Sequence, residues 1–226
     1  MTDSGKAVKI AEQIAAISKQ LPPQTRLVAV TKKVSVPAMR QAYQAGIRDF
    51  GESRIQELEA KQAEMEDLRD VTWHFIGHLQ RNKAKRAVEL CQWIHSVDSL
   101  ALARRLNQLA ADRPQQPRIC LQVKILDDPD KYGWSVADLK TELSDLMQCN
   151  FLDFRGLMTI LPLGLSEEEQ LSAFKQVRTL AEQLTQQTDR VLNLQELSMG
   201  MSGDYQLAVQ AGSTLVRVGR LLFGER

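Results

Sequence analysis

Short apolar runs rich in β-branched residues alternate with longer amphipathic segments along this chain. Residues 7–20 carry apolar side chains at helical spacing, and Leu21-Pro22-Pro23 ends that predicted helix. The first apolar run, residues 27–32, has the length and composition of a buried strand. The alternation then continues, so strands and helices are predicted to follow one another strictly.

The pattern predicts eight strands, at residues 27–32, 47–50, 71–76, 93–97, 118–126, 154–160, 194–199 and 214–218. Predicted helices follow the first seven, at residues 36–46, 53–67, 80–90, 99–111, 135–149, 166–188 and 202–212, and a short tail follows the last. Strict alternation implies parallel pairing with right-handed crossovers, and eight units close a (β/α)8 barrel of the TIM type. We therefore predict an α/β fold with a single barrel domain over residues 1–226.

A doubly wound open sheet is the alternative fold. A sheet of that kind that binds a dinucleotide typically has a Gly-x-Gly-x-x-Gly turn after its first strand. This chain has Thr31-Lys32-Lys33-Val34 at that point, which favours the barrel.

Composition narrows the classes of partner. The 29 basic and 28 acidic residues give a net charge of +1, which offers no electrostatic case for nucleic acid or an anionic membrane. The three cysteines have no metal-ligand spacing and are predicted to be small buried hydrophobes in a reducing compartment. No apolar stretch has membrane-spanning length, and residues 1–6 lack the apolar core of a signal peptide. We expect a cytoplasmic protein and, without a long apolar seam, a monomer.

The two lysines that end the first predicted strand are the first candidates for chemistry. A buried strand end would lower the pKa of an amine and make it a better nucleophile, although both lysines could instead stand in water. Val28, Val30 and Lys32 share one face of the strand, and barrel interiors favour bulky branched residues. That parity predicts Lys32 in the barrel mouth and Lys33 outside it.

A second candidate is the loop Ser198-Met199-Gly200-Met201-Ser202-Gly203-Asp204, with Gly219 further along. Barrels often hold a phosphate between the loops after strands seven and eight, where glycines let backbone N–H groups approach an anion. The alternative is a plain turn. Asp204 would repel a phosphate, so its carboxylate is expected to accept a backbone N–H.

Arginine and histidine side chains in the predicted strands need partners. Arg217 lies between two valines, so it is either paired to an acid or aimed at a ligand atom. His74, His78 and His95 have no common spacing, which favours hydrogen-bonded core or rim positions over metal binding. Met158, Met199 and Met201 are expected to serve packing.

Several of these segments together resemble one family, the pyridoxal phosphate homeostasis proteins, also called the YggS or PROSC family, which share their barrel with the N-terminal domain of alanine racemase. The matching segments are Ala29-Val30-Thr31-Lys32, Phe50-Gly51-Glu52, residues 74–83, Ser96-Val97-Asp98, Lys131-Tyr132-Gly133, residues 155–158, residues 198–204, residues 216–219 and Phe223-Gly224. The resemblance extends from about residue 26 to residue 224. One departure is Ser53, which stands where the family usually has Asn after Gly-Glu, so any contact of that amide is in question.

The resemblance implies a cofactor and a site. Lys32 matches the lysine that forms a Schiff base with pyridoxal 5′-phosphate (PLP), and Arg217 matches the arginine that faces the pyridine nitrogen. The phosphate cradle is matched by Ser198, Met199, Gly200, Ser202 and Gly219.

The function implied is vitamin B6 homeostasis, in which PLP is held reversibly and released to PLP-requiring apoenzymes. An arginine at the pyridine nitrogen disfavours ring protonation and so weakens the electron sink. The sequence also stops soon after the eighth strand, so we expect no acid/base group opposite Lys32 and no catalytic residue. The spacing of the histidines and cysteines gives no reason to expect a metal. The alternatives are a PLP-dependent amino-acid racemase and a metal-dependent or phosphosugar barrel enzyme. Lys131 and Lys83 remain candidates for a part in release.

Overall fold

Eight parallel strands close into a barrel in the computed structural model, which describes residues 3–188 and 191–225. The barrel strands are β1 (Arg26–Val30), β2 (Asp49–Glu52), β3 (Thr72–Phe75), β4 (Trp93–Val97), β5 (Arg118–Lys124), β7 (Asp153–Met158), β8 (Glu196–Ser198) and β9 (Leu215–Val218). β1 pairs with both β2 and β9, and β4 pairs with β5, so the sheet has no open side. Closure confirms the predicted barrel and excludes the doubly wound sheet.

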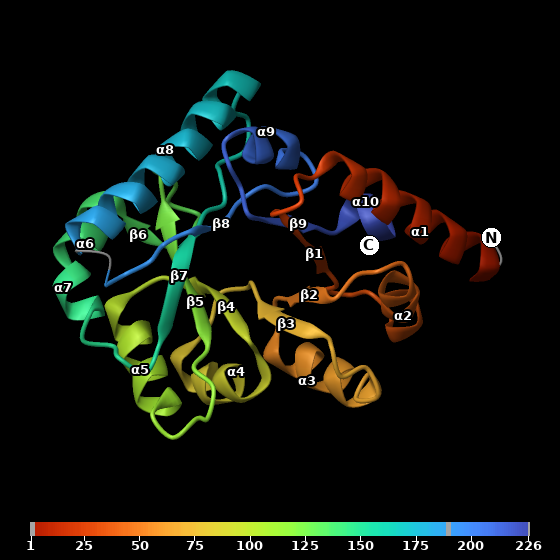
Figure 1. Cartoon of the computed structure of the whole chain (residues 1–226), viewed down its shortest axis with the longest axis horizontal. Coiled ribbons are helices and arrows are strands. Elements are labelled where there is room, and N and C mark those ends of the chain that lie inside the picture. Colours follow the sequence, from red (N-terminus) through yellow and green to blue (C-terminus); the bar gives the residue numbers. More distant parts are fainter. Residues whose placement is uncertain (1–2, 189–190, 226) are drawn as a thin grey trace.

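Helices lie around the strands (Figure 1). They are α1 (Asp3–Gln20), α2 (Val36–Gln44), α3 (Ile55–Glu64), the 3₁₀ helix η1 (Arg81–Lys83), α4 (Ala84–Leu90), α5 (Leu100–Ala110), α6 (Val136–Thr141), α7 (Leu143–Leu146), α8 (Glu167–Gln187), α9 (Tyr205–Gln210) and α10 (Arg220–Phe223). The start of α8 is fixed by a capping box between Ser166 and Glu169. None of the helices in residues 3–188 and 191–225 is both long and apolar enough to cross a membrane.

Four details differ from the sequence prediction. The first strand ends at Val30 rather than at residue 32, and the predicted helix 135–149 is interrupted at Glu142, which separates α6 from α7. A two-residue strand, β6 (Trp134–Ser135), pairs with β5. The predicted tail contains α10. The assignment of residues 1–226 to one domain stays a prediction, and residues 1, 2, 189, 190 and 226 lie outside the described part.

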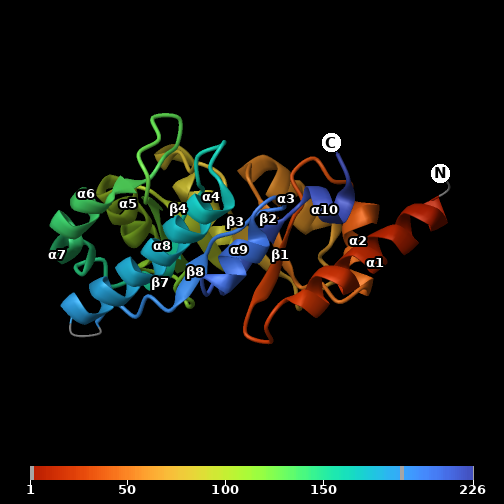
Figure 2. The ribbon, with the colours of Figure 1, turned by 90° about the horizontal axis from the view of Figure 1, so that it is seen from above.

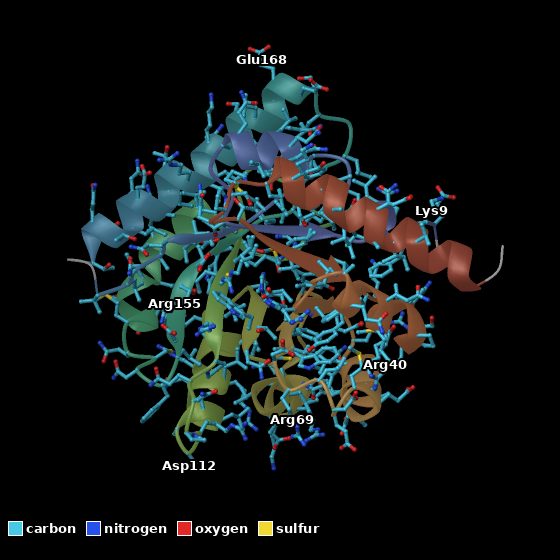
Figure 3. All side chains as sticks on the ribbon, turned by 45° about the vertical axis from the view of Figure 1, so that its right-hand side comes forward. Lys9, Arg40, Arg69, Asp112, Arg155 and Glu168 are labelled. Carbon is cyan, nitrogen blue, oxygen red and sulfur yellow. The ribbon has the colours of Figure 1, made fainter. Side chains whose placement is uncertain are left out.

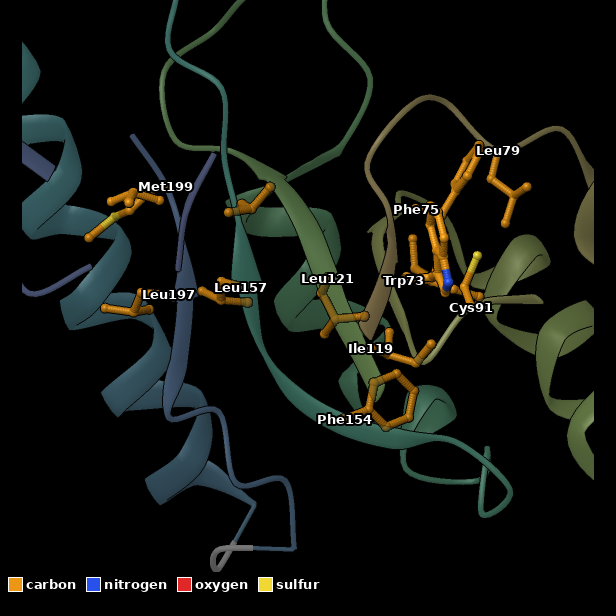
Figure 4. Close-up of a cluster of buried hydrophobic side chains, with 14 of the residues drawn as sticks. Trp73, Phe75, Leu79, Cys91, Ile119, Leu121, Phe154, Leu157, Leu197 and Met199 are labelled. Carbon is orange, nitrogen blue, oxygen red and sulfur yellow. The ribbon is translucent and has the colours of Figure 1, made fainter. Parts of the chain in front are cut away.

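Alternation of side chains along the strands divides the core into two clusters. Outward-facing residues such as Ile119, Leu121 and Leu157 pack against the helices in the large outer core (Figure 4). The small inner cluster consists of Val28, Trp93, Cys120, Met158 and Leu215. Labelled charged residues such as Lys9 and Glu168 lie at the periphery (Figure 3). The inner cluster confirms that the Val28 face of β1 points into the barrel.

All three cysteines are buried and free, as predicted. Burial raises the pKa of the Cys120 thiol, which lies in the inner cluster, and so keeps it protonated. Met158 and Met199 are likewise fully buried, which confirms their packing role.

Candidate functional site

The candidate site lies at the carboxyl ends of the strands, because the turn after β1, the loop after β8 and the end of β9 meet there in a parallel barrel. The loops that follow β5 and β7 project from one side of the molecule (Figure 2). Each functional side chain is therefore positioned by the strand that precedes it.

Lys32 lies in a tight turn directly after β1. The Val34 N–H donates to the Thr31 carbonyl oxygen at 2.8 Å, and Lys33 adopts φ +58°, in the left-handed region. Lys32 is exposed, not buried. The expectation that desolvation activates a strand-end amine is therefore wrong, because the turn carries the chain out of the barrel wall after Thr31.

The outer side of this turn is held against α3. The Thr31 side chain is fully buried, and its hydroxyl donates to Glu52 Oε1 at 2.6 Å. The Lys33 N–H donates to Glu57 Oε1 at 2.5 Å. These contacts place the residues on either side of Lys32 on the helix side. The position of the Lys32 amine within the mouth stays a prediction.

Arg217 is the buried cation of the site, with 4% of its surface exposed. Its Nη1 donates to Ser198 Oγ at 2.7 Å, and its Nη2 donates to the Thr159 carbonyl oxygen at 2.9 Å. Both acceptors are neutral, and burial lowers the pKa of Arg217 to about 10. These two contacts are not the acid pairing considered from the sequence.

A chain of buried hydrogen bonds runs from Arg217 through the barrel interior. His95 Nδ1 lies 2.7 Å from Ser198 Oγ, His74 Nδ1 lies 2.9 Å from His95 Nε2, and His74 Nε2 lies 2.8 Å from Asp49 Oδ1. We call this chain the histidine relay. Burial lowers the pKa of both imidazoles, that of His95 well below its ordinary value, so both are neutral near pH 7.

Because both imidazoles are neutral, the hydrogen bonds of the relay can run in one direction only. The Asp49 carboxylate only accepts, so His74 Nε2 carries the proton and His74 Nδ1 accepts from His95 Nε2–H. His95 Nδ1 then accepts from the Ser198 hydroxyl, whose oxygen accepts from Arg217. Every contact has one donor and one acceptor, so the relay holds the Arg217 guanidinium in place through Ser198.

The two predicted halves of a phosphate cradle come together. The Gly219 N–H donates to Ser202 Oγ at 3.4 Å, and the Arg217 N–H donates to the Gly200 carbonyl oxygen at 2.9 Å. Gly200 has φ +93°, and a Cβ there would lie 2.6 Å from Ala208 Cβ, so only glycine fits without movement. Asp204 Oδ1 accepts the Met201 N–H at 2.5 Å, as expected.

Two other predicted cradle residues direct their side chains elsewhere. The Ser198 hydroxyl is committed to Arg217 and His95 inside the barrel. Met199 is packed in the outer core. Any contribution of Met199 to anion binding therefore comes from its backbone.

The donor set fits PLP. Arg217 offers a buried cation held by neutral groups, Ser202 and Gly219 bring a hydroxyl and a backbone N–H together, and Lys32 offers an exposed amine. These groups match a pyridine nitrogen, a phosphate and an aldehyde respectively.

Sequence reasoning missed two groups of residues. One is the histidine relay, although His74 and His95 do occupy core positions as expected. The other is the set of contacts that the buried Glu52 and Lys61 and the half-buried Glu57 make beside the Lys32 turn. Strand parity applied to β3 and β4 could have placed both histidines inside the barrel, since Trp93 and His95 share one face.

His78 is a rim residue, as predicted. Its ring stacks on Tyr132 with centroids 3.6 Å apart, and its Nδ1 lies 3.1 Å from Asp98 Oδ2. This stack ties the loop after β5 to the loop after β3.

Fold and site together define a barrel of the alanine racemase N-terminal type: a family model described as "Alanine racemase, N-terminal domain" matches residues 7–226. A "Pyridoxal phosphate homeostasis protein" of Synechocystis is 48% identical to this chain, over 91% of this chain and 94% of its own. Its Escherichia coli K12 counterpart is 36% identical, over 91% and 87%. The chain belongs to the pyridoxal phosphate homeostasis protein family.

Solved structures agree with this placement. PipY of Synechococcus elongatus, solved with PLP bound, is 53% identical with a TM-score of 0.91, over 95% of this chain and 100% of its own. Alanine racemase of Clostridium difficile superposes with a TM-score of 0.75 at 13% identity, over 96% of this chain and 60% of its own. The second likeness shows the fold alone.

Proposed function

We propose that this protein binds PLP at the barrel mouth and takes part in PLP homeostasis. Lys32 would supply the amine, Arg217 would bind the pyridine nitrogen, and Ser202, Gly219 and the backbone of residues 198–200 would hold the phosphate. Bound PLP would supply an aldehyde for a reversible condensation with the Lys32 amine, which releases one water. Reversible binding suits storage and release to PLP-requiring apoenzymes.

The observation that carries this proposal is the arrangement of Arg217. Its guanidinium is buried but is hydrogen bonded to the neutral groups Ser198 and Thr159, so its positive charge is available to an electron-rich acceptor in the mouth. Membership of the family supports the same cofactor, since PipY was solved with PLP bound.

A racemase is the second candidate, and we propose that the protein is not an enzyme. A cation facing the pyridine nitrogen keeps that nitrogen unprotonated, which weakens the ring as an electron sink. The curated relatives are named for homeostasis rather than for racemisation. We further propose a cytoplasmic monomer. Sustained, Lys32-dependent interconversion of D- and L-amino acids would establish the racemase instead.

A PLP titration followed by absorbance tests the binding proposal. The full chain should develop the visible absorbance of a Schiff base, and borohydride should abolish that band. Lys32→Ala should lose it. Lys33→Ala is the matched control, because Lys33 is the adjacent exposed lysine of the same turn. A colourless wild-type protein at saturating PLP, or a band that survives Lys32→Ala, would contradict the proposal and reopen the metal-dependent or phosphosugar alternatives.

A further inference from the structure

The turn that carries Lys32 is conformationally demanding. Lys33 is the only non-glycine with positive φ that residues 3–188 and 191–225 contain, and a lysine in the left-handed region is strained. Strained backbone persists only where surrounding contacts determine it. The contacts around this turn therefore identify the groups that hold the backbone of Lys32 in place.

Those contacts come from α3 and from the end of β2. The Thr31 carbonyl oxygen accepts from Lys61 Nζ at 2.7 Å as well as from the Val34 N–H. On the other side of Lys32, the Lys33 N–H donates to Glu57 Oε1. The backbone is thus held by hydrogen bonds to side chains immediately before and immediately after Lys32.

The same groups bind one another. Lys61 Nζ also donates to Glu52 Oε1 at 2.7 Å and to Glu57 Oε1 at 2.6 Å. These two bonds and the bond to Thr31 use all three ammonium hydrogens. Lys61 is 6% exposed and Glu52 is fully buried. We call Glu52, Glu57 and Lys61 the clamp.

A buried ion pair of this kind is weak evidence for stability, because desolvation of two charges offsets much of their attraction. What it does supply is a fixed position. The clamp also keeps Lys61 away from an aldehyde, since the side chain is buried and its Nζ is hydrogen bonded to two carboxylates and a carbonyl oxygen.

We propose that the clamp is a positioning device for Lys32: Glu57 and Lys61 hold the strained turn so that the Lys32 amine meets its electrophile in a fixed geometry. The inference rests on the proposed function, because the electrophile is the PLP aldehyde. Glu52 fixes the position of Lys61 by pairing with it, and it also accepts a hydrogen bond from the Thr31 hydroxyl.

The test separates positioning from affinity. The full chain, freed of bound PLP, is mixed with rising PLP concentrations while the Schiff-base absorbance is followed, which gives a limiting rate and a half-saturating concentration. Glu57→Ala should lower the limiting rate at least about tenfold, because small displacements of a reacting group are costly. The half-saturating concentration, set by the cradle and Arg217, should stay within about twofold.

Two further variants make the result specific. Glu57→Gln keeps an oxygen acceptor for the Lys33 N–H and should recover most of the wild-type rate. Glu59→Ala is the matched control: it lies on the same helix, its side chain is 49% exposed, and it pairs with Arg86 instead. It should leave both constants unchanged. Should Glu57→Ala fail to fold, the double variant Glu52→Gln with Lys61→Met, which strands no buried charge, carries the same expectation.

An unchanged limiting rate in a folded Glu57→Ala protein, or equal losses in Glu57→Ala and Glu59→Ala, would overturn the positioning role while the wild type still formed its adduct. A wild type that forms no adduct on Lys32 would instead overturn the proposed function. The two failures are therefore distinguishable.

Discussion

Two buried serines differ in their hydrogen bonding, and this difference predicts how much each contributes to the free energy of unfolding. Ser198 and Ser96 are both fully buried. Ser198 joins Arg217 to His95, whereas Ser96 Oγ is a buried atom without a hydrogen-bond partner in the part of the chain that the structure describes. The same substitution, serine to alanine, should therefore cost much stability at Ser198 and little at Ser96.

The magnitude follows from the groups left behind. Ser198→Ala strands the Arg217 Nη1–H and the His95 Nδ1 acceptor, and each stranded buried group costs about 1–3 kcal/mol, so we expect a loss of about 2–6 kcal/mol. Ser96→Ala removes a hydroxyl that is already unsatisfied and should change the free energy of unfolding by less than about 1 kcal/mol, in either direction.

Urea unfolding of the PLP-free proteins, followed by circular dichroism and tryptophan fluorescence, measures the difference. With a slope of about 3 kcal/mol/M, the Ser198→Ala midpoint should fall by about 0.7–2 M while the Ser96→Ala midpoint barely moves. PLP must be absent, because a ligand that binds only the folded state adds its own stabilisation. Equal losses in the two variants would refute the reasoning that the relay is satisfied and directional.

Three further outcomes follow from the relay and the cradle. Because burial lowers the pKa of His74 and His95 below that of the unfolded chain, the unfolded state takes up protons first, and stability should fall as pH drops below about 6.5. Urea midpoints against pH should show that His95→Gln flattens this slope by up to about 1.4 kcal/mol per pH unit, and an unchanged slope would contradict this. Gly200→Ala should cost more stability than Gly164→Ala, since both have positive φ but a Cβ at Gly164 meets nothing within 4 Å; equal thermal midpoints would contradict this.

The fold was predictable because each unit of the barrel has its own local pattern. The run at 93–97, for example, has apolar residues at Trp93, Ile94 and Val97, follows a helix and is followed by the Ser99 cap of α5, so its limits needed no tertiary information. The two-residue strand β6 has no such pattern. It is defined only by its pairing with β5 across the intervening loop, which aligns Val123 with Trp134.

The site was predictable only in part. Lys32, Arg217 and the cradle carry distinctive residue types at strand ends, where barrels collect function. The relay depends on partners 21 and 103 positions apart in sequence, so no local pattern reveals it. Lys61 has the appearance of a surface lysine on a helix, and only its burial beside Glu52 shows otherwise. The sequence left the exposure of Lys32 open, because the first strand was predicted to run to residue 32, whereas β1 ends at Val30.

The most direct measurement of the central claim is the location of the covalent bond. The protein saturated with PLP is reduced with borohydride, digested with a protease that does not depend on lysine, and mapped by fragmentation mass spectrometry. The account predicts the pyridoxyl group on Lys32, with Lys33 and Lys61 unmodified. A pyridoxyl group on Lys33 or Lys61 at equal or higher occupancy, or none on Lys32, would contradict it.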